Sequence, residues 1–340
     1  MNMISNQLNP KYLGFNQSNG FLSNKMYLAK QLSGVPTNEI YPQKYISPTG
    51  VYCDLVEKLR ITNSLAESDY VLVPHDWVSI YKNNTYLRYL QDLSKDKPLL
   101  LFNTGDLSPK IKTKNTLEIR TFLHPWENSY QKIIIPYAVK ARSFKLRSWK
   151  PKPTISFMGY VPKLTPGSLF GYNMKSLFHP ISSSVYINRK LSGIRLNITK
   201  NKFEINFIKR DNFTAYHKNS NLKENLADFQ NSLDNSDYIL CPRGYGNTSI
   251  RFYESLSAGR TPILIDSKGA LPVLDDNEPW SKHIVTVDIL LKWVKLIEKD
   301  WSSLYEKSEY EQRQVKNYEL FTKFLNYNSY LTALFTKYLK

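Results

Sequence analysis

Short apolar runs alternate with stretches of helical spacing along most of the chain. The apolar runs predict buried strands at 11–15, 70–73, 98–102, 132–135, 154–161, 203–207, 237–241 and 261–265. Apolar residues at helical spacing predict helices at 54–65, 85–93, 181–194, 222–233 and 250–258, and through 286–340. Strands that alternate with helices are typical of parallel sheets, so the pattern predicts an α/β protein.

One stretch, from Ser236 to Pro272, gives the clearest prediction of local structure. Its first strand, 237–241, leads into the glycine-rich segment PRGYGNTS and then a helix, for which Thr248 or Ser249 is the expected N-cap. Gly259 is placed to end that helix, and a second buried strand follows at 261–265. The stretch therefore predicts a strand, glycine loop, helix and strand in series.

Such a loop is suited to binding a nucleotide diphosphate. The amino end of a helix carries unpaired N–H groups and a partial positive charge, which favour phosphate. Arg243 in the loop and Arg251 in the first helical turn can both donate to a diphosphate, and Glu254 can accept hydrogen bonds from ribose hydroxyls. Alternatively, Arg251 and Glu254 form only a surface pair at i,i+3 spacing. The loop residues expected to line the site are Gly244, Tyr245, Gly246, Asn247, Thr248 and Ser249.

The same stretch resembles the C-terminal signature of the exostosin glycosyltransferases. The shared features are C-P-R-G, S-x-R-hydrophobic-x-E, G-x-x-P and L-P. The resemblance implies a GT-B fold, with two Rossmann-like domains facing a central cleft, and transfer from a UDP-linked sugar with inversion, typical of polysaccharide biosynthesis. It also implies that Arg243 and Arg251 hold the diphosphate and Glu254 the ribose. The run TISFMGYV resembles the family's glycine strand, which adds Gly159 and, on the following helix, Arg189 to the expected site.

The catalytic base is expected in the N-terminal half, where polar residues follow predicted strands. SDYVLVPHDW resembles a family segment and places His75 and Asp76 just after a strand, while NTGD places Asp106 after the next strand. A base for the acceptor hydroxyl is commonly a histidine or a carboxylate at such a strand end. The alternatives are a helix cap for Asp76, a loop position for His75 and a turn for Asp106. His124 is a further candidate for contact with the acceptor.

The predicted organisation has two domains joined by a basic segment that contains proline. Lys140–Pro153 has no acidic residue and is interpreted as the linker. We expect an acceptor-binding domain at 1–145, a nucleotide-sugar domain at 146–300, and C-terminal helices at 301–340 that pack back on the first domain.

Composition and charge limit the function classes. The formal net charge is +17, which suits nucleic acid, an anionic membrane or an anionic substrate. No helix-turn-helix, zinc or RNP pattern supports nucleic-acid binding, so a basic nucleic-acid-binding protein is the less favoured alternative. A non-catalytic nucleotide- or sugar-binding module of the same fold remains open. There is no Asp-x-Asp motif, and we expect neither a metal nor another cofactor.

The sequence also supports expectations about where the protein is located and what it binds. No signal peptide or apolar run of membrane-spanning length is evident, so a cytoplasmic protein is expected, with peripheral contact at the inner membrane face. Of the two cysteines, Cys241 lies on a predicted buried strand, which favours a reducing compartment. The expected partners are a nucleotide sugar and a glycan or lipid-linked acceptor.

Overall fold

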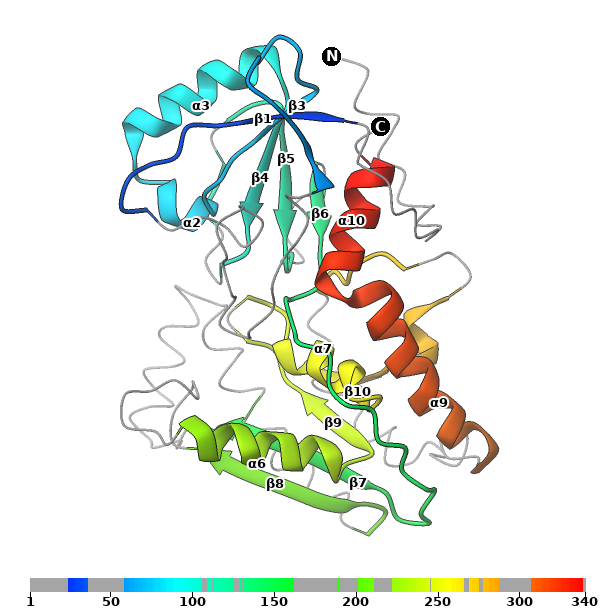
Figure 1. The fold of residues 1–340 in the computed structure, drawn as a ribbon. Helices are drawn as coiled ribbons and strands as arrows, with labels where there is room; N and C mark the ends of the chain where they lie inside the picture. Colours follow the sequence, from blue (N-terminus) through cyan, green and yellow to red (C-terminus); the bar gives the residue numbers. More distant parts are fainter. Residues whose placement is uncertain are drawn as a thin grey trace, which may run out of the picture. The chain divides into compact units, whose positions relative to one another are not determined.

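Two units, each built on a parallel β-sheet, make up the chain in a computed structural model (Figure 1). Unit 1 comprises Met1–Lys140, Gly269–Pro279 and Lys323–Lys340, and unit 2 comprises Ala141–Lys268 and Trp280–Thr322. The structure describes residues 24–35, 58–105, 109–111, 113–124, 127, 129, 131–161, 189, 201–210, 222–244, 246–265, 269–274, 278–287 and 307–338.

Within the described residues, unit 1 holds a six-stranded sheet with the order β2-β1-β3-β4-β5-β6, in which all neighbours pair in parallel. The strands are β1 (Lys25–Leu28), β2 (Arg60–Thr62), β3 (Tyr70–Leu72), β4 (Leu99–Asn103), β5 (Thr116–Arg120) and β6 (Lys132–Ile134). The order reverses between β1 and β3, which makes the carboxyl ends of these two strands the topological switch point.

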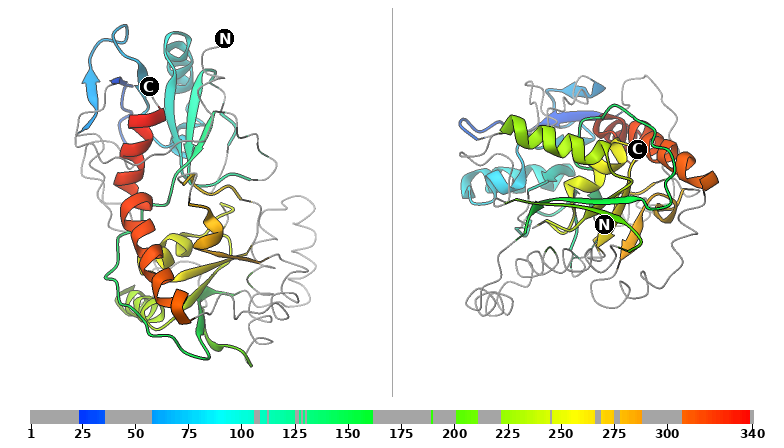
Figure 2. Two further views of the ribbon diagram at one scale, coloured as in Figure 1. Left: turned by 90° about the vertical axis from the view of Figure 1, so that its right-hand side faces the viewer. Right: turned by 90° about the horizontal axis from the view of Figure 1, so that it is seen from below.

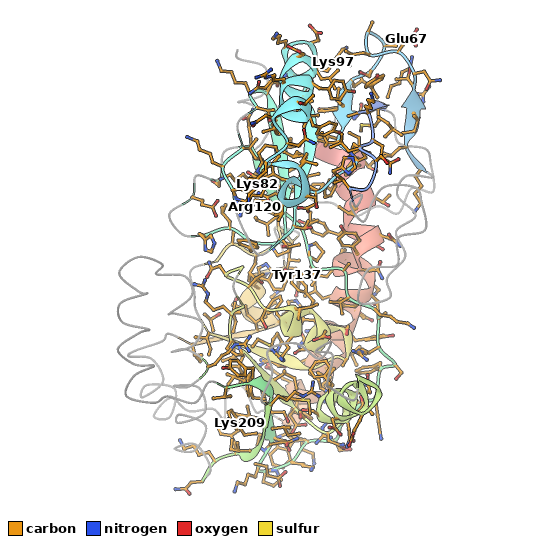
Figure 3. All side chains as sticks on the ribbon, turned by 90° about the vertical axis from the view of Figure 1, so that its left-hand side faces the viewer. Glu67, Lys82, Lys97, Arg120, Tyr137 and Lys209 are labelled. Atoms are coloured by element: carbon orange, nitrogen blue, oxygen red, sulfur yellow. The ribbon has the colours of Figure 1, made fainter. Side chains whose placement is uncertain are left out.

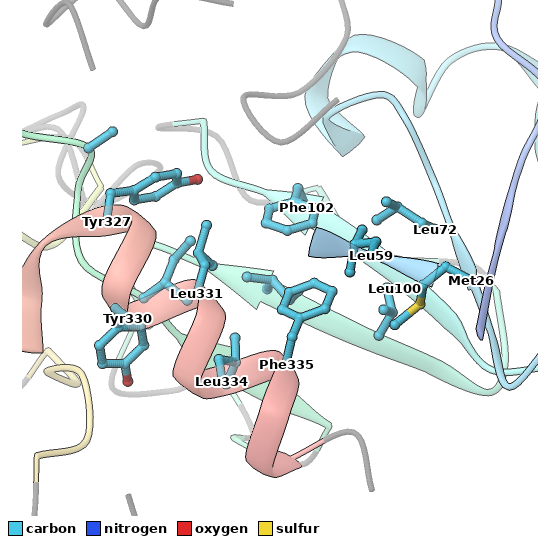
Figure 4. Packing of buried hydrophobic residues seen from close by; sticks show 13 residues of the cluster. Met26, Leu59, Leu72, Leu100, Phe102, Tyr327, Tyr330, Leu331, Leu334 and Phe335 are labelled. Carbon is cyan, nitrogen blue, oxygen red and sulfur yellow. The ribbon is translucent and has the colours of Figure 1, made fainter. Parts of the chain in front are cut away.

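Both faces of this sheet are covered, because successive side chains of β4 enter different clusters. Leu99 and Leu101 pack with α2 (Trp77–Ile80) and α3 (Asn84–Asp96). Leu100 and Phe102 pack on the opposite face with α10 (Tyr327–Tyr338), as Figure 4 shows. A strand buried on both faces needs the continuous apolar run LLLF rather than an alternating pattern.

Unit 2 repeats the same plan, with the strand order β11-β10-β9-β7-β8 and parallel pairing throughout its described residues. The strands are β7 (Thr154–Tyr160), β8 (Glu204–Arg210), β9 (Tyr238–Cys241), β10 (Thr261–Ile265) and β11 (Val285–Val287). The helix α6 (Leu222–Asp234) packs on β7, and the right-hand view of Figure 2 shows it lengthwise beside the green strands, while α7 (Ile250–Ser257) packs on β9 and β10. The order reverses between β7 and β9.

The helix α9 (Lys307–Leu320) is fixed to unit 2 by buried polar contacts rather than by an apolar stripe. Gln314 accepts a 2.8 Å hydrogen bond from Nη1 of Arg260 and a 2.9 Å bond from the backbone N–H of Arg147. Asn317 donates to the carbonyl of Arg260 and lies 2.8 Å from Nδ1 of His283. Buried polar groups that are satisfied in this way specify one arrangement of the helix. The chain continues through a short 3-10 helix, η1 (Trp280–Lys282), before β11, and through a π-helix, η3 (Phe321–Leu325), into α10.

The predicted fold class, α/β with two Rossmann-like domains, is confirmed. The predicted helix at 54–65 is wrong over Arg60–Thr62, which forms β2 and pairs with β1. The helical prediction for 286–340 is wrong at residues 286 and 287, which belong to β11 and pair with β10. The strand at 11–15 and the helix at 181–194 fall outside the described residues, except Arg189, which is helical. No helix in the described part of the chain has the length and apolarity needed to cross a membrane.

Candidate nucleotide-sugar site

The candidate site lies at the switch point of unit 2, where β7 and β9 end. Ligands of open α/β sheets bind beyond the carboxyl ends of the strands at this point. Gly159 and Tyr160 end β7, and Cys241 ends β9 and leads into the segment before α7. The sequence signature and the glycine strand therefore come together at one edge of the sheet.

The loop before α7 is closed by its own backbone. The N–H of Gly244 donates a 2.7 Å hydrogen bond to the carbonyl of Thr248, and Asn247 adopts a left-handed conformation with φ 51°. Asparagine tolerates this conformation better than most residues. Gly246 and Thr248 are buried in the loop, while Tyr245 lies outside the described residues.

Ser249 is the N-cap residue of α7, as the sequence predicted, but its side chain makes no capping hydrogen bond. Its φ of −131° and ψ of 124° are the extended values usual at this position. The amino end of α7 is therefore not closed by its own cap side chain. This is the arrangement in which helix N–H groups can bind an anion.

Arg251 reaches from the first turn of α7 to the end of β7. A Cβ atom added to Gly159 would lie 2.8 Å from Nη2 of Arg251, and the guanidinium lies 5.6 Å from the centre of the Phe157 ring. Burial lowers the pKa of Arg251, opposed by the nearby carboxylate of Glu254. Its Nε is buried and has no hydrogen-bond partner among the residues that the structure describes. A desolvated guanidinium with an unused donor is suited to a bound anion.

Glu254 lies one turn further along α7, with a side chain that is 15% exposed. Its carboxylate is 3.8 Å from Nη2 of Arg142. Burial raises the pKa of Glu254, and the charges of Arg251 and Arg142 act against that rise. The carboxylate thus contacts one cation, Arg142, and feels the charge of a second, Arg251.

Two further arginines of the sequence prediction lie at the same edge. Arg243, in the loop after β9, is buried, and burial lowers its pKa to about 10. Arg189 is also buried, and its Nη1 donates a 3.3 Å hydrogen bond to the carbonyl of Tyr160. The structure therefore brings Arg189 and Arg251 to the end of β7, where Arg189 contacts Tyr160 and Arg251 lies beside Gly159.

Sequence reasoning missed Arg142 and Arg210. Arg210 ends β8 opposite Tyr160, and its charge contributes, after burial, to the lowered pKa of Arg251. Arg210 follows the predicted strand 203–207 by three residues, and β8 continues further than the sequence predicted, to Arg210 itself. Arg142 lies in an irregular segment before β7, and nothing in the local sequence connects it with Glu254.

His75, a predicted catalytic residue, lies at the switch point of unit 1. It is fully buried, and its Nε2 accepts a 2.8 Å hydrogen bond from the backbone N–H of Leu32 in the loop after β1. Its ring packs edge-on against Tyr86. An imidazole that accepts through Nε2 is neutral, and the lone pair that a base would use is occupied. His75 in this arrangement secures the loop after β1.

Asp76 is the N-cap of α2, the alternative that the sequence left open. Its Oδ1 accepts from the backbone N–H of Val78, and its Oδ2 accepts from the backbone N–H and the hydroxyl of Thr104 at 2.8 and 2.6 Å. Burial raises its pKa, opposed by these hydrogen bonds. Asp76 thereby joins the ends of β3 and β4. A catalytic role for it stays a prediction, and Asp106 lies outside the described residues.

His124 lies on a loop that is held by buried charges. Arg120, at the end of β5 (Figure 3), contacts Glu118 at 3.5 Å and Glu127 at 2.6 Å. Glu127 also accepts a 2.9 Å hydrogen bond from the backbone N–H of His124. The loop is therefore fixed at the carboxyl edge of the sheet. Contact of His124 with an acceptor stays a prediction.

Comparison with known families gives one match. Residues 174–339 match the model of the RXYLT1 C-terminal domain, an exostosin-related glycosyltransferase family. This match confirms the resemblance to exostosin-type glycosyltransferases. The exostosin-related region contains Arg189 and the whole stretch from Arg243 to Glu254, whereas Gly159 and the unit 1 candidates precede it. No match was found among the curated proteins.

Solved structures with a similar arrangement are distant in sequence. A mutant of S. aureus TarM, in complex with Fondaparinux, alpha-GlcNAc-glycerol and UDP, is 8% identical, with a TM-score of 0.37, over 79% of this chain and 55% of that chain. A. baumannii MurG is 10% identical over 83% and 85%, with a TM-score of 0.35. The catalytic domain of Arabidopsis thaliana starch synthase IV, bound to ADP and acarbose, is 10% identical over 80% and 73%, with a TM-score of 0.37. The chain covers between 55% and 62% of the TarM structures.

Proposed function

We propose that this chain transfers a sugar from a UDP-linked donor to a glycan or lipid-linked acceptor, with inversion and without a metal ion. The observation that carries the proposal is the guanidinium of Arg251 at the switch point of unit 2, whose buried Nε has no hydrogen-bond partner among the described residues. The exostosin-related family match over the same helix supports a sugar-nucleotide donor.

The donor diphosphate would lie at the amino end of α7. Arg251 and Arg243 carry positive charge at this edge, and the N-cap side chain leaves the helix end open. Glu254 would accept hydrogen bonds from the ribose hydroxyls. Arg189, beside the last peptide of β7, adds a further positive charge close to the diphosphate.

The reaction would be a single displacement. The acceptor hydroxyl oxygen forms a bond to the anomeric carbon as the bond from that carbon to the phosphate oxygen breaks, and UDP leaves with the electron pair. One displacement inverts the anomeric centre. Fixed guanidinium groups and helix N–H groups can stabilise the charge that develops on the leaving diphosphate, which is the part a metal ion plays elsewhere.

The proton of the acceptor hydroxyl would pass to a base of unit 1. Because His75 and Asp76 are engaged in hydrogen bonds that hold loops, Asp106 is the candidate base that we favour. Contact with an anionic membrane surface and a cytoplasmic location stay predictions.

Calorimetric titration with UDP in the presence of EDTA tests the donor site. We expect the wild type to bind UDP and Arg251→Ala to bind at least about tenfold more weakly, a loss of about 1.4 kcal/mol. Arg88→Ala is the matched control, because Arg88 is exposed on α3 in unit 1. Absence of UDP binding by the wild type, or equal binding by Arg251→Ala, would overturn the donor assignment.

Turnover separates an enzyme from a binding module of the same fold. Incubation with a panel of UDP-sugars, with and without EDTA, should release UDP from at least one donor at rates that EDTA does not change. Binding of UDP without release from any donor and acceptor pair would favour the non-catalytic module. Release that depends on added Mg²⁺ or Mn²⁺ would refute metal independence.

A further inference from the structure

Arg142 contacts Glu254 from a segment far away in the sequence. It lies in the irregular stretch 141–153 that precedes β7, and its Nη2 is 3.8 Å from Oε1 of Glu254. Glu254 is the residue that we assign to the ribose, so Arg142 bears on the proposed site through this carboxylate.

Other contacts hold Arg142 in place. Its Nη1 donates a hydrogen bond to the side chain of Gln230 on α6, and its guanidinium lies 5.9 Å from the centre of the Phe229 ring. Gln230 is itself fixed, because its amide donates a 2.8 Å hydrogen bond to Asp234. The charge of Arg142 is therefore positioned by α6 before any ligand binds.

The two cations beside Glu254 would have different tasks once a nucleotide is bound. Arg251 would share its charge with the diphosphate, which reduces what it contributes to the neighbouring carboxylate. Arg142 has its two Nη atoms engaged by Gln230 and Glu254, while its Nε is buried and has no hydrogen-bond partner among the described residues. Arg142 is thus directed at the carboxylate, and it would continue to neutralise Glu254 in the complex.

We propose that Arg142 is a positioning residue of the donor site, which keeps the Glu254 carboxylate ionised and oriented to accept hydrogen bonds from the two ribose hydroxyls. This inference rests on the proposed function, because it takes a nucleotide diphosphate at α7 as the ligand. Arg142 acts through Glu254 and does not itself touch the nucleotide. Its removal should therefore affect only nucleotides that carry ribose hydroxyls.

The experiment compares UDP with 2′,3′-dideoxy-UDP, measured by calorimetry. We expect Arg142→Gln to bind UDP about fivefold more weakly, the size usual for a partly exposed charge pair. Its affinity for dideoxy-UDP should equal that of the wild type. Arg142→Lys, which keeps the charge, should bind UDP within about twofold of the wild type.

A cycle with Glu254→Gln identifies the residue through which Arg142 acts. In the Glu254→Gln background, Arg142→Gln should cause no further loss of UDP affinity. Lys145→Gln is the matched control, because it removes one charge from an exposed side chain of the same segment and should leave both affinities unchanged. Arg142→Met, which keeps an aliphatic stem over Phe229, replaces Arg142→Gln if that variant does not fold.

Three results would overturn the role of Arg142 and leave the donor site assignment intact. These are an unchanged UDP affinity in Arg142→Gln, an equal loss for UDP and dideoxy-UDP, and a loss that persists in the Glu254→Gln background. In each case Arg251→Ala would still weaken UDP binding. If Arg251→Ala binds UDP like the wild type, the donor site itself is misplaced, and the inference fails together with the proposed function.

Discussion

Gly159 and Arg251 occupy adjoining space at the end of β7, and the guanidinium of Arg251 fills the position that a side chain at residue 159 would take. A Cβ atom there would lie 2.8 Å from Nη2 and 3.3 Å from Cζ of Arg251. Contacts below 3.0 Å require one group to move. The glycine of the strand is thus needed for the position of the arginine.

Gly159→Ala should weaken UDP binding by displacing Arg251. The nearest group is the end of a flexible side chain, so we expect the protein to fold and the guanidinium to shift instead. The expected loss of UDP affinity is about tenfold, close to that of Arg251→Ala. In an Arg251→Ala background, Gly159→Ala should add little, because the displaced group is absent. Additive losses would show that Gly159→Ala acts by a route other than Arg251, such as the buried Phe157 ring, whose Cζ lies 3.1 Å from the added Cβ.

The pH dependence of UDP binding should report the ionisation of Glu254. Burial raises its pKa, so the carboxyl group holds its proton to a higher pH than an exposed glutamate. The ionised form is the one that accepts two hydroxyl hydrogen bonds. UDP affinity should therefore fall as the pH drops through the raised pKa, and binding should be accompanied by proton release in that range.

The matched variant for this pH profile is Glu254→Gln. UDP protonates near pH 6 by itself, so only the difference between the two profiles belongs to the side chain. We expect the wild type to lose affinity more steeply than the variant on acidification. Parallel profiles, measured by calorimetry in two buffers of different ionisation enthalpy, would contradict a titrating Glu254.

Asp76 offers a test that separates a helix cap from a catalytic base. Asp76→Asn keeps an oxygen acceptor for the Val78 N–H but turns an NH2 group towards the N–H of Thr104. It should therefore lower the free energy of unfolding by about 1 kcal/mol and leave UDP-sugar turnover within about tenfold of the wild type. Asp76→Ala removes the acceptor for Val78 and Thr104 and should lower the free energy of unfolding by about 1–2 kcal/mol. A stable Asp76→Asn protein with turnover lowered by more than a thousandfold would instead identify Asp76 as the base.

Both sheets could be predicted from sequence where strands are apolar throughout. The runs ending at Phe102, Cys241 and Ile265 are buried on both faces, and each was predicted within one or two residues. The strand β5 was missed because its sequence, TLEIR, carries two charged residues. Glu118 and Arg120 are nevertheless buried, since they neutralise one another at 3.5 Å on one face of the strand.

Short edge strands were harder to predict. Arg60–Thr62 lies in a stretch whose leucine spacing fits a helix, and its strand conformation comes from pairing with β1. The two paired strands are distant in sequence, so the spacing of residues within Arg60–Thr62 does not predict the pairing.

For the candidate site, too, the sequence predicted the residues of one continuous segment and missed those that approach from elsewhere in the chain. The loop and helix from Arg243 to Glu254 are continuous in sequence, so their residue types and spacing were enough to suggest a phosphate site. Arg142 reaches Glu254 only because the segment before β7 passes α6 and α7 in the folded unit. Contacts of this kind depend on the packing of whole elements and have no local signature.

Gly259 provides a stability test of the turn between α7 and β10. It has a φ of +70°, and a Cβ atom there would lie 2.5 Å from the ring of Phe144 and 2.9 Å from the carbonyl oxygen of Gln314. Phe144 is stacked on Tyr318 with ring centres 4.9 Å apart, so the ring cannot move without losing that contact. Gly259→Ala therefore combines backbone strain with overpacking.

Gly34→Ala is the matched control for Gly259→Ala, because Gly34 has a similar φ of +75° and none of the described residues places an atom within 4 Å of an added Cβ. We expect about 1 kcal/mol of destabilisation at Gly34, from the left-handed backbone alone. At Gly259 we expect about 3 kcal/mol, since displacement of packed groups adds about 1–3 kcal/mol. Scanning calorimetry, which follows the transition of each unit, should show the larger decrease in Tm for Gly259→Ala. Equal decreases would mean that Phe144 and Gln314 yield at no cost, and the fit of this turn against α9 would then contribute nothing to the stability of unit 2.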